Sequence, residues 1–347
     1  MSQDTFRLPA EWERQSAVLI AWPHADTDWA ERLAEVETTY VALATAVTRF
    51  EDLIVVVADE TLGVHAETAM RAAGADLSRI RFVRLPYDDT WLRDSGPITL
   101  VDNDGKVRLN DFRFTGWGGK FGAEQDDALI AGLVDAGVFG NAGHKRIDWA
   151  LEGGGIESDG EGTVLTTWRC LVQRHPDESR ESMTGTLVDG LHARRVLWLD
   201  YGYLEGDDTD AHIDTLARFA PGNGIVFQAC DDASDPHSDE LTRMAGELAA
   251  LRTVDGKPYT LYPLPWAQPI VDEGRRLAAS YANYLIVNGA VLVPAYGDAV
   301  DDEAARIIGT AHPGREVVQV PCRPLIWQNG SLHCITMQLP AALSPTA

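Results

Sequence analysis

The sequence predicts an α/β fold, and three observations support that prediction. Apolar stretches of strand length recur along the 347 residues and alternate with stretches of helical pattern. Low-complexity tracts and linkers rich in Ser, Gly and Pro are absent, which favours a single domain over residues 1–347. Polar segments able to carry chemistry recur at intervals near 60 residues. That interval fits a chain of about five similar α/β units around an axis.

Seven apolar runs are the expected strands: residues 17–21, 53–58, 164–167, 195–199, 224–230, 284–294 and 317–320. Four stretches between them are the expected helices: residues 30–50, 125–136, 238–251 and 301–309. In the third of these, Leu241, Met244 and Leu248 recur at spacings of three and four, which places them on one helix face. Strands that alternate with helices are the pattern of α/β proteins.

The chain is strongly acidic, with 53 Asp and Glu against 29 Lys and Arg and a net charge of −24. Nucleic acid is not an expected partner, because phosphate contacts require clustered Lys and Arg side chains. A small cationic molecule would be attracted to such a field. The same composition also fits a surface adapted to a salty cytoplasm, so the charge alone does not assign a function.

No segment of the sequence predicts an association with membranes. The longest apolar run, residues 284–294, is much shorter than the roughly 20 residues that cross a bilayer. Residues 1–12 contain Asp4, Arg7 and Glu11 and lack the apolar region of a secretory signal. We therefore expect a cytoplasmic protein.

Four cysteines are scattered along the chain without a Cys-x-x-Cys pair: Cys170, Cys230, Cys322 and Cys334. This spacing argues against a zinc site and against a disulfide framework. Most cysteines in a reducing compartment are inert core residues. Cys334 differs from the others because it follows a turn that contains Gly330 and lies beside polar residues. The sequence therefore favours Cys334 as the accessible thiol.

Two acidic segments are candidates for binding a cation. Residues 87–97 contain three carboxylates and Trp91, and an Asp in a half-buried wall beside a tryptophan suits a positive charge. A solvated loop is the alternative reading of this segment. Glu152 is followed by three glycines without the spacing of a phosphate loop, and an acid there would repel phosphate. Such glycines allow the backbone to approach a ligand closely.

The unit His212-Ile213-Asp214 combines a general acid or base with a carboxylate. In an extended chain both side chains would project from one face. Metal binding is a competing interpretation, but no further His or Cys lies at ligand spacing there, so we expect no metal. In the same extended geometry, His333 would point away from Cys334. We therefore pair Cys334 with His212 and expect His333 to be structural or a supporting donor.

Together these segments resemble the agmatine deiminases, within the wider group of bacterial peptidyl-arginine deiminases and other guanidine-modifying enzymes of pentein fold. The resemblance runs nearly end to end. It is carried by residues 8–12, 21–24, 90–97, 116–120, 151–157, 210–214, 288–291 and 333–336. A single motif of this kind would be weak, but the ordered set is specific.

The resemblance implies a five-bladed α/β propeller with pseudo-fivefold symmetry, an active site on its axis and a homodimer. It implies that Cys334 is the nucleophile and His212 the general acid and base, and that Glu152 orients His212. It also implies that Asp94 and Asp214 bind the guanidinium nitrogens. The expected substrate is agmatine, a small cationic guanidine, and no organic cofactor or metal is required.

Two further points concern the substrate. Residues 328–332 depart from the run of glycines that many agmatine deiminases carry before the cysteine. Asp88, Trp91 and Trp117 are candidates for the far end of the pocket, where an amine suits acidic or aromatic walls. Free arginine and peptidyl-arginine are alternative substrates, and a non-catalytic guanidine-binding protein is the alternative from another class.

Overall fold

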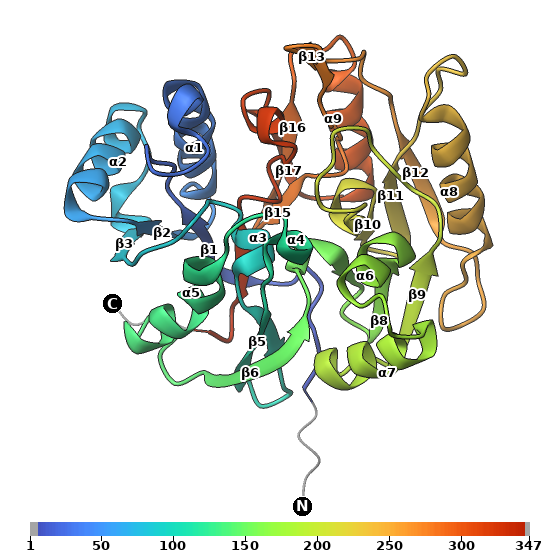
Figure 1. Cartoon of the computed structure of the whole chain (residues 1–347), viewed down its shortest axis with the longest axis horizontal. Coiled ribbons are helices and arrows are strands. Elements are labelled where there is room, and N and C mark those ends of the chain that lie inside the picture. Colours follow the sequence, from blue (N-terminus) through green and yellow to red (C-terminus); the bar gives the residue numbers. More distant parts are fainter. Residues whose placement is uncertain (1–5, 344–347) are drawn as a thin grey trace, which may run out of the picture.

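The computed structural model describes residues 6–343, and five sheets of three or four strands carry the fold in that range (Figure 1). The sheets follow one another along the chain. The four-stranded sheet contains β1 (Gln15–Ala21), β2 (Asp52–Val57), β3 (Ile80–Arg84) and β18 (Met337–Pro340). The second contains β4 (Ile98–Val101), β5 (Val107–Arg113) and β6 (Gly143–Ala150), and the third contains β7 (Ile156–Ser158), β8 (Thr163–Thr167) and β9 (Arg195–Leu199). The fourth contains β10 (Ala217–Ala220), β11 (Gly224–Gln228) and β12 (Thr260–Leu264), and the fifth contains β15 (Leu285–Val287), β16 (Ala290–Ala295) and β17 (Glu316–Pro321).

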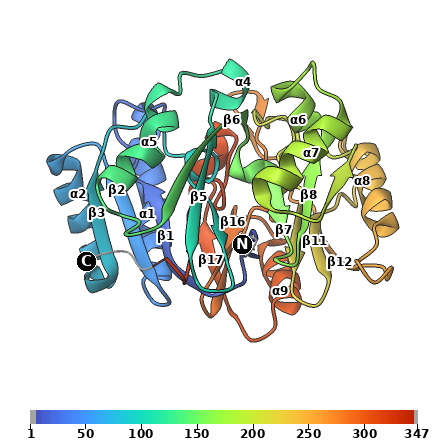
Figure 2. The ribbon, with the colours of Figure 1, turned by 90° about the horizontal axis from the view of Figure 1, so that it is seen from below.

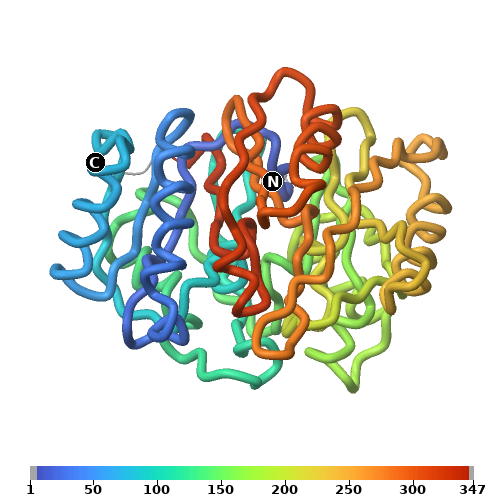
Figure 3. Tube along the Cα trace, turned by 90° about the horizontal axis from the view of Figure 1, so that it is seen from above, coloured from blue at the N-terminus to red at the C-terminus, as the bar shows by residue number. Residues whose placement is uncertain are grey.

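One pairing pattern recurs in these five sheets. Strand β4 runs antiparallel to β5, and β5 runs parallel to β6. The sheets that begin with β7, β10 and β15 repeat this order. In the four-stranded sheet the last strand of the chain, β18, takes the antiparallel place beside β1. Figure 3 shows these first and last segments side by side, so the two ends of the chain are joined in one sheet.

The helices lie mainly outside the sheets, as the view from below shows (Figure 2). The longer ones are α1 (Leu33–Val47), α2 (Glu60–Ala72), α5 (Glu124–Asp135), α7 (Arg180–Leu191), α8 (Ser238–Ala250) and α9 (Asp301–Ala311). Shorter helical turns are η1 (Ala30–Arg32), η2 (Leu77–Arg79), α3 (Leu92–Ser95), α4 (Gly116–Gly119), η3 (Gly153–Gly155), α6 (Trp168–Arg174), η4 (Ile213–Thr215) and η5 (Leu325–Gln328). Within residues 6–343, no helix is long and apolar enough to cross a bilayer.

Two elements differ from the sequence prediction. The apolar run 284–294 is a hairpin of β15 and β16 rather than one strand, because Asn288 and Gly289 form its turn and Gly289 takes a positive φ of 78°. The expected helix 30–50 divides into η1 and α1, and α1 ends at Val47. The sequence analysis did not predict strands β3–β7, β10, β12 and β18, helices α2 and α7, or the small hairpin of β13 (Val271–Asp272) and β14 (Arg275–Arg276).

Short turns before the antiparallel strands position the polar residues. Turn α3 precedes β4, η3 precedes β7, and η4 precedes β10. A further turn, residues 332–335, precedes β18. Turn η3 contacts both α3 and η4, so three of these turns meet in the interior. The spacing of about 60 residues therefore places successive polar segments at equivalent points of successive sheets.

Candidate active site

Gly154 lies at the centre of the converging side chains. A methyl group at this position would come within 2.7 Å of both Asp94 Oδ1 and His212 Nδ1, and within 3.2 Å of Asp214 Oδ2. Such distances are far below van der Waals contact, so only glycine fits here. The glycines after Glu152 thus allow the backbone to approach the polar side chains of the site. The backbone N–H of Gly154 donates a hydrogen bond to Asp94 Oδ1 at 3.0 Å.

His212 is fully buried between two carboxylates. Its Nδ1 lies 3.6 Å from Asp94 Oδ1, and its Nε2 lies 3.5 Å from Glu152 Oε2. Burial alone would lower the pKa of His212, but the Asp94 carboxylate, followed by Cys170 and Glu152, raises it well above its ordinary value. The ring is therefore suited to hold and donate a proton.

The local backbone at His212 differs from the extended unit that the sequence predicted. His212 precedes the 3-10 turn η4, which contains Asp214, so the two residues are not on a strand. Both side chains are nevertheless fully buried and meet at Gly154. The turn is closed by the hydroxyl of Thr215, which donates to the carbonyl of His212 at 2.9 Å.

Glu152 is held by Arg174, which the sequence did not single out. Arg174 Nε donates to Glu152 Oε1 at 2.7 Å, and its Nη1 donates to Asp210 Oδ2 at 2.7 Å. Burial alone would raise the pKa of Glu152, but His212 and Arg174 bring it down to about 2. Glu152 is thus a fixed negative charge beside His212. Lys120 Nζ also contacts Asp210 Oδ2 at 2.7 Å and ties this network to the loop after α4.

Asp94 is in the one-turn helix α3, which ends before Gly96 and Pro97. Its Oδ2 accepts a hydrogen bond from Trp117 Nε1 at 2.9 Å. Trp117 has a left-handed backbone with φ of 56°, a strained conformation that aims its indole at this carboxylate. Burial, with Asp214 and Glu152 adding to it, raises the pKa of Asp94 to about 6.

Cys334 lies in the turn before β18, whereas the sequence predicted the start of an extended segment. Its Sγ is 3.7 Å from Asp214 Oδ2. Burial raises the pKa of the Cys334 thiol, and the Asp214 and Asp94 carboxylates raise it further. The thiol faces a cavity of about 380 Å³. The cavity walls are Asp28, Asp89, Trp91, Asp94, Trp117, Phe121, Asp208, Thr209, Arg275, Trp327, Gln328, Asn329, Gly330 and Cys334.

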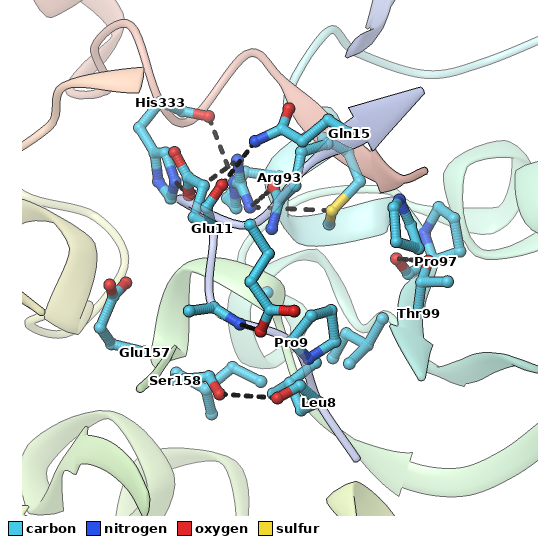
Figure 4. Close-up of a pocket in the computed structure, with 18 of the residues that line it drawn as sticks. Leu8, Pro9, Glu11, Gln15, Arg93, Pro97, Thr99, Glu157, Ser158 and His333 are labelled. Atoms are coloured by element: carbon cyan, nitrogen blue, oxygen red, sulfur yellow. Dashed lines mark hydrogen bonds and ion pairs between the residues drawn. The ribbon is translucent and has the colours of Figure 1, made fainter. Parts of the chain in front are cut away.

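His333 points to the opposite side of the chain from Cys334, into a smaller pocket of about 60 Å³ (Figure 4). Its Nδ1 lies 2.8 Å from Asp214 Oδ2, and its Nε2 lies 2.6 Å from Glu11 Oε2. Arg93 lines the same small pocket, although its neighbour Asp94 lines the large one. His333 is therefore a supporting contact behind Asp214, in line with one of the two roles expected from the sequence.

The three residues expected at the far end of the substrate pocket have different positions. Trp91 and Trp117 line the cavity. Asp88 does not, because its carboxylate accepts from the backbone of Gln125 at 2.7 Å and caps the start of α5. The neighbouring carboxylate, Asp89, lines the wall in its place. The geometry thus does not favour Asp88 as a substrate contact.

One group of residues in the described range has ligand atoms close enough to hold a metal ion. Glu152, Cys170 and His212 offer one atom each, and these atoms lie within 4.8 Å of one another. Sequence spacing could not show this group, because Cys170 comes from α6. The cation Arg174 already pairs with Glu152 at 2.7 Å, which weakens the attraction of this group for a second cation.

Asn283 is a further site residue that the sequence analysis missed. It is fully buried, and its Nδ2 lies 3.2 Å from Cys334 Sγ. The 122 residues between His212 and Cys334, twice the usual interval, signalled an additional unit between them. Glu11 lies in the segment 8–12 that contributed to the resemblance, but no role was assigned to it, and Arg174 lies in none of those segments.

Comparison with known proteins identifies the family. The profile of the Porphyromonas-type peptidyl-arginine deiminases matches residues 7–340. The chain belongs to this family. Among curated relatives, the agmatine deiminase of Stutzerimonas stutzeri is 34% identical over 98% of this chain and 96% of its own length. The agmatine deiminase of Pseudomonas putida is 33% identical over 97% of this chain and 96% of its own. These findings confirm the resemblance read from the motifs.

Solved structures of deiminases share the fold. A C. jejuni agmatine deiminase variant with substrate bound has a TM-score of 0.89 and 31% identity, and covers 99% of this chain and 97% of its own. A Porphyromonas gingivalis structure, whose name gives arginine deiminase as a provisional activity, has a TM-score of 0.89 and 45% identity over 97% of this chain and 99% of its own. The predicted α/β class is therefore confirmed as the mixed α/β fold of these deiminases.

Proposed function

We propose that this protein hydrolyses the guanidinium group of agmatine to N-carbamoylputrescine and ammonia. The observation that carries the proposal is one cluster of side chains. Cys334 and Asp94 line the cavity, Asp214 Oδ2 lies 3.7 Å from Cys334 Sγ, and His212 Nδ1 lies 3.6 Å from Asp94 Oδ1. The agmatine deiminases among the relatives and solved structures support the same activity.

Asp94 and Asp214 would bind the guanidinium nitrogens. Asp214 Oδ1 is buried and has no hydrogen-bond partner within residues 6–343, whereas its Oδ2 faces His333. A guanidinium presents N–H donors in a planar fork, so it can donate to Asp214 Oδ1 and to Asp94 from opposite edges. This arrangement orients the central carbon toward Cys334 Sγ.

The first half of the reaction forms a bond between Sγ and the guanidinium carbon. The Cys334 thiolate supplies the electron pair, and the positive charge of the substrate favours that thiolate. His212 donates its proton to one –NH₂ group, the C–N bond breaks, and ammonia leaves. The product of this half is a cationic amidino thioether on Cys334.

The second half hydrolyses this intermediate. Neutral His212 removes a proton from water, and the hydroxide attacks the amidino carbon. The C–S bond then breaks and returns its electron pair to Sγ, and the O-protonated ureido product loses its hydroxyl proton to solvent, where the ammonia released in the first half takes it up. Glu152 keeps the ring of His212 in place and stabilises its protonated form, as the third member of a triad does.

The walls of the cavity favour an amine at the far end of the substrate over a carboxylate. Besides Asp94, three carboxylates line the cavity, those of Asp28, Asp89 and Asp208. Arg275 is the arginine of the lining, and its guanidinium already donates to Asn329 Oδ1 and to the carbonyl of Trp327. The carboxylate of free arginine would have to displace these contacts, whereas the ammonium of agmatine meets carboxylates directly.

The remaining expectations complete the proposal. The repeated antiparallel and parallel pairing of the five sheets supports a five-bladed propeller of pentein type. The site residues come from turns between residues 94 and 334, which supports one catalytic domain over the chain. A homodimer that acts without an organic cofactor follows from the resemblance alone, whereas the cytoplasmic location and the absence of a metal are expectations from the sequence itself.

An assay for the ureido product tests the proposed activity. Agmatine, free arginine and an arginyl peptide are each supplied to the purified protein. We expect agmatine to be hydrolysed with a kcat/KM at least about tenfold above that for the other two, because one extra unpaired charge in the pocket costs more than 1.4 kcal/mol. A higher kcat/KM for arginine or for the peptide would show that this molecule, and not agmatine, is the substrate. If agmatine binds and no product forms, the protein is a guanidine-binding protein and not an enzyme.

Asp94 gives a second prediction, which concerns pH. Its functional form is the carboxylate, so guanidinium binding is present above its pKa of about 6 and is lost as the pH falls through that value. We therefore expect kcat/KM for agmatine to fall about tenfold per unit below pH 6. Asp94→Asn should lower kcat/KM at neutral pH roughly 10- to 150-fold, the equivalent of a charge-assisted bond of about 1.5–3 kcal/mol.

The control for this prediction is Asp59→Asn, which keeps the cap that Asp59 provides to α2. This variant should retain the wild-type profile. An Asp94→Asn variant with an unchanged kcat/KM would exclude Asp94 from guanidinium binding. A fall below pH 6 that persists in Asp94→Asn would assign the titration to another group.

A further inference from the structure

A second thiol, which the proposed reaction does not use, lies beside the ring of His212. Cys170 is in α6 and is fully buried. Its sulfur, a nitrogen of His212 and an oxygen of Glu152 lie within 4.8 Å of one another. A methyl group on Gly155 would lie 3.5 Å from Cys170 Sγ and 3.9 Å from His212 Nε2, so these two atoms face the same side of that glycine. A thiol, an imidazole and a carboxylate thus meet at one point.

Two of these three groups have a buried atom that lacks a partner. Within residues 6–343, His212 Nε2 and Glu152 Oε2 have no hydrogen-bond partner, although both side chains are fully buried. Unpaired polar atoms are costly in the interior, so this pair of atoms is a place for a further group. The two atoms are 3.5 Å apart. Two ligands of a tetrahedral Zn²⁺ ion, a nitrogen and an oxygen at about 2.1 Å from the metal, are about 3.4 Å apart.

Cys170 completes a set of three ligands of the kinds that Zn²⁺ prefers. In proteins Zn²⁺ is bound by Cys sulfur at about 2.3 Å, by His nitrogen and by carboxylate oxygen. A sulfur and a nitrogen ligand of one tetrahedral ion are about 3.6 Å apart, so the three atoms have to close by little more than about 1 Å from their limit of 4.8 Å. The fourth position of the ion is left for water.

Arg174 determines which kind of cation this group can hold. Its guanidinium pairs with Glu152 Oε1 at 2.7 Å and leaves Oε2 without a partner within residues 6–343. The positive charge of Arg174 repels a second cation, and the penalty is most severe for Mg²⁺ and Ca²⁺, which bind to oxygen atoms through their charge. Zn²⁺ also forms strong bonds to soft thiolate and to imidazole ligands. The group therefore favours Zn²⁺ over these hard cations.

We propose that Cys170, His212 and Glu152 form an inhibitory Zn²⁺ site. On binding, the protons of the Cys170 thiol and of His212 Nε2 pass to solvent, and the metal takes their places. The ring then carries a proton on Nδ1 only as a neutral imidazole, which is a far weaker acid than the imidazolium that protonates the leaving ammonia. Zn²⁺ therefore removes the general acid of the first half of the reaction. The inhibition rests on the proposed function, whereas the coordination itself does not.

Cobalt binding tests the coordination without substrate. Co²⁺ binds to the same kinds of ligand as Zn²⁺, and its bond to a thiolate gives an intense near-ultraviolet absorption band. Co²⁺ is titrated into chelator-treated wild-type protein and into the Cys334→Ser variant, which lacks the proposed nucleophile. We expect the same band in both proteins, at about one Co²⁺ per chain, because Cys334 is not a ligand. A band that is lost in Cys334→Ser would place the ion at the nucleophile and overturn the proposal.

Cys170→Ser and Cys170→Ala identify the ligand. Serine keeps the size of the side chain, and alanine avoids a buried hydroxyl, so the test requires only that one of the two unfolds cooperatively in urea. Removing a residue that merely orients a metal ligand lowers metal affinity about 10- to 100-fold. We therefore expect the loss of a ligand to weaken Co²⁺ binding at least about 100-fold and to abolish the band. A band that remains in the folded variant would overturn the proposal.

Cys322→Ser is the matched control. Cys322 is as fully buried as Cys170, but it is not one of the group of residues in the range 6–343 whose atoms could hold a metal. Its change to serine should leave both the absorption band and the affinity for Co²⁺ unchanged. Equal losses in Cys322→Ser and Cys170→Ser would show that a change in the core, and not a missing ligand, releases the ion, and would overturn the proposal.

Inhibition of agmatine hydrolysis is the second readout. We expect Zn²⁺ to inhibit the wild-type protein slowly, since the site is buried, and a chelator to restore the activity. Mg²⁺ and Ca²⁺ at the same concentration should not inhibit. In Cys170→Ala, the Zn²⁺ concentration for half inhibition should rise at least about 100-fold. Inhibition of that variant at the wild-type Zn²⁺ concentration would overturn the inhibitory site.

The two readouts distinguish failure of this inference from failure of the proposed function. If the wild-type protein hydrolyses none of the three guanidines but shows a Co²⁺ band that depends on Cys170, the proposed function fails and the metal site stands. If agmatine is hydrolysed and Co²⁺ gives no thiolate band, the function stands and the metal site is excluded. A band that depends on Cys170, without inhibition by Zn²⁺, would overturn the inhibitory role.

Discussion

Cys334→Ser should retain binding of agmatine and lose turnover by at least about 10⁴-fold, as expected when the nucleophile of a covalent mechanism is removed. The serine hydroxyl has nearly the size of the thiol, so the turn before β18 and its contact with Asn283 should persist. A hydroxyl is much harder to ionise than a thiol. Buried beside the Asp214 and Asp94 carboxylates, it would not supply an anion at neutral pH.

The covalent intermediate makes this prediction specific. Wild-type enzyme quenched with acid during turnover should carry an amidino adduct on the peptide that contains Cys334, detected by mass spectrometry. Cys230→Ser is the control, because Cys230 is partly exposed and outside the cavity. It should keep both the activity and the adduct. Near-normal turnover by Cys334→Ser, or an adduct on a different cysteine, would remove Cys334 from the mechanism.

The residues that the sequence could identify are those in dense motifs. Asp94, Glu152 and His212 each lie in a short segment of polar residues and glycines, and such segments stand out against the apolar runs around them. The spacing of these segments also has a structural cause, because each one precedes the antiparallel strand of a new sheet. Periodicity along the chain thus reports a repeated unit even where no residue identity repeats.

The direction of individual side chains is not visible in the same way. Asp88 and Asp89 are adjacent acids in one motif, yet Asp88 caps α5 and Asp89 lines the cavity. The choice depends on where the helix α5 begins in space, some 37 residues later in the chain. His212 and Asp214 likewise meet through a 3-10 turn, although an extended chain would have brought them together equally well. Composition and spacing do not distinguish the 3-10 turn from the extended chain.

Long-range ion pairs are the other part that the sequence hides. Glu11, Glu157 and Arg218 come from three distant segments and form one buried group beneath the site. Glu11 and Glu157 lie in segments that contributed to the resemblance, and Arg218 stands alone between apolar neighbours, but nothing in the sequence shows that these three charges meet. Their contact follows only from the way the first strand pairs with the last and the third sheet packs on the fourth.

Arg218→Met should therefore lower the free energy of unfolding by about 3–5 kcal/mol, the cost of breaking a buried ion pair from one side. Arg218 is fully buried. Its guanidinium donates at 2.7 Å each to Glu157 Oε2, Glu11 Oε2 and the carbonyl of Tyr284. Methionine fills much of the volume but removes the guanidinium from a carbonyl and two carboxylates, which keep the contacts of His333 Nε2 with Glu11 at 2.6 Å and of the Phe219 N–H with Glu157 at 3.1 Å. Urea unfolding measures the loss.

Arg49→Met is the comparison that separates burial from charge. Arg49 pairs with Glu316 at 2.8 Å, but both side chains are 49% exposed, so its loss should cost about 0–1 kcal/mol. Adding Glu157→Gln to Arg218→Met removes one of the two orphaned charges, and should restore part of the stability, because the penalty comes from unpaired charge and not from the missing arginine. Equal costs for Arg218→Met and Arg49→Met would contradict this account. A double variant no more stable than Arg218→Met alone would place the cost in packing instead.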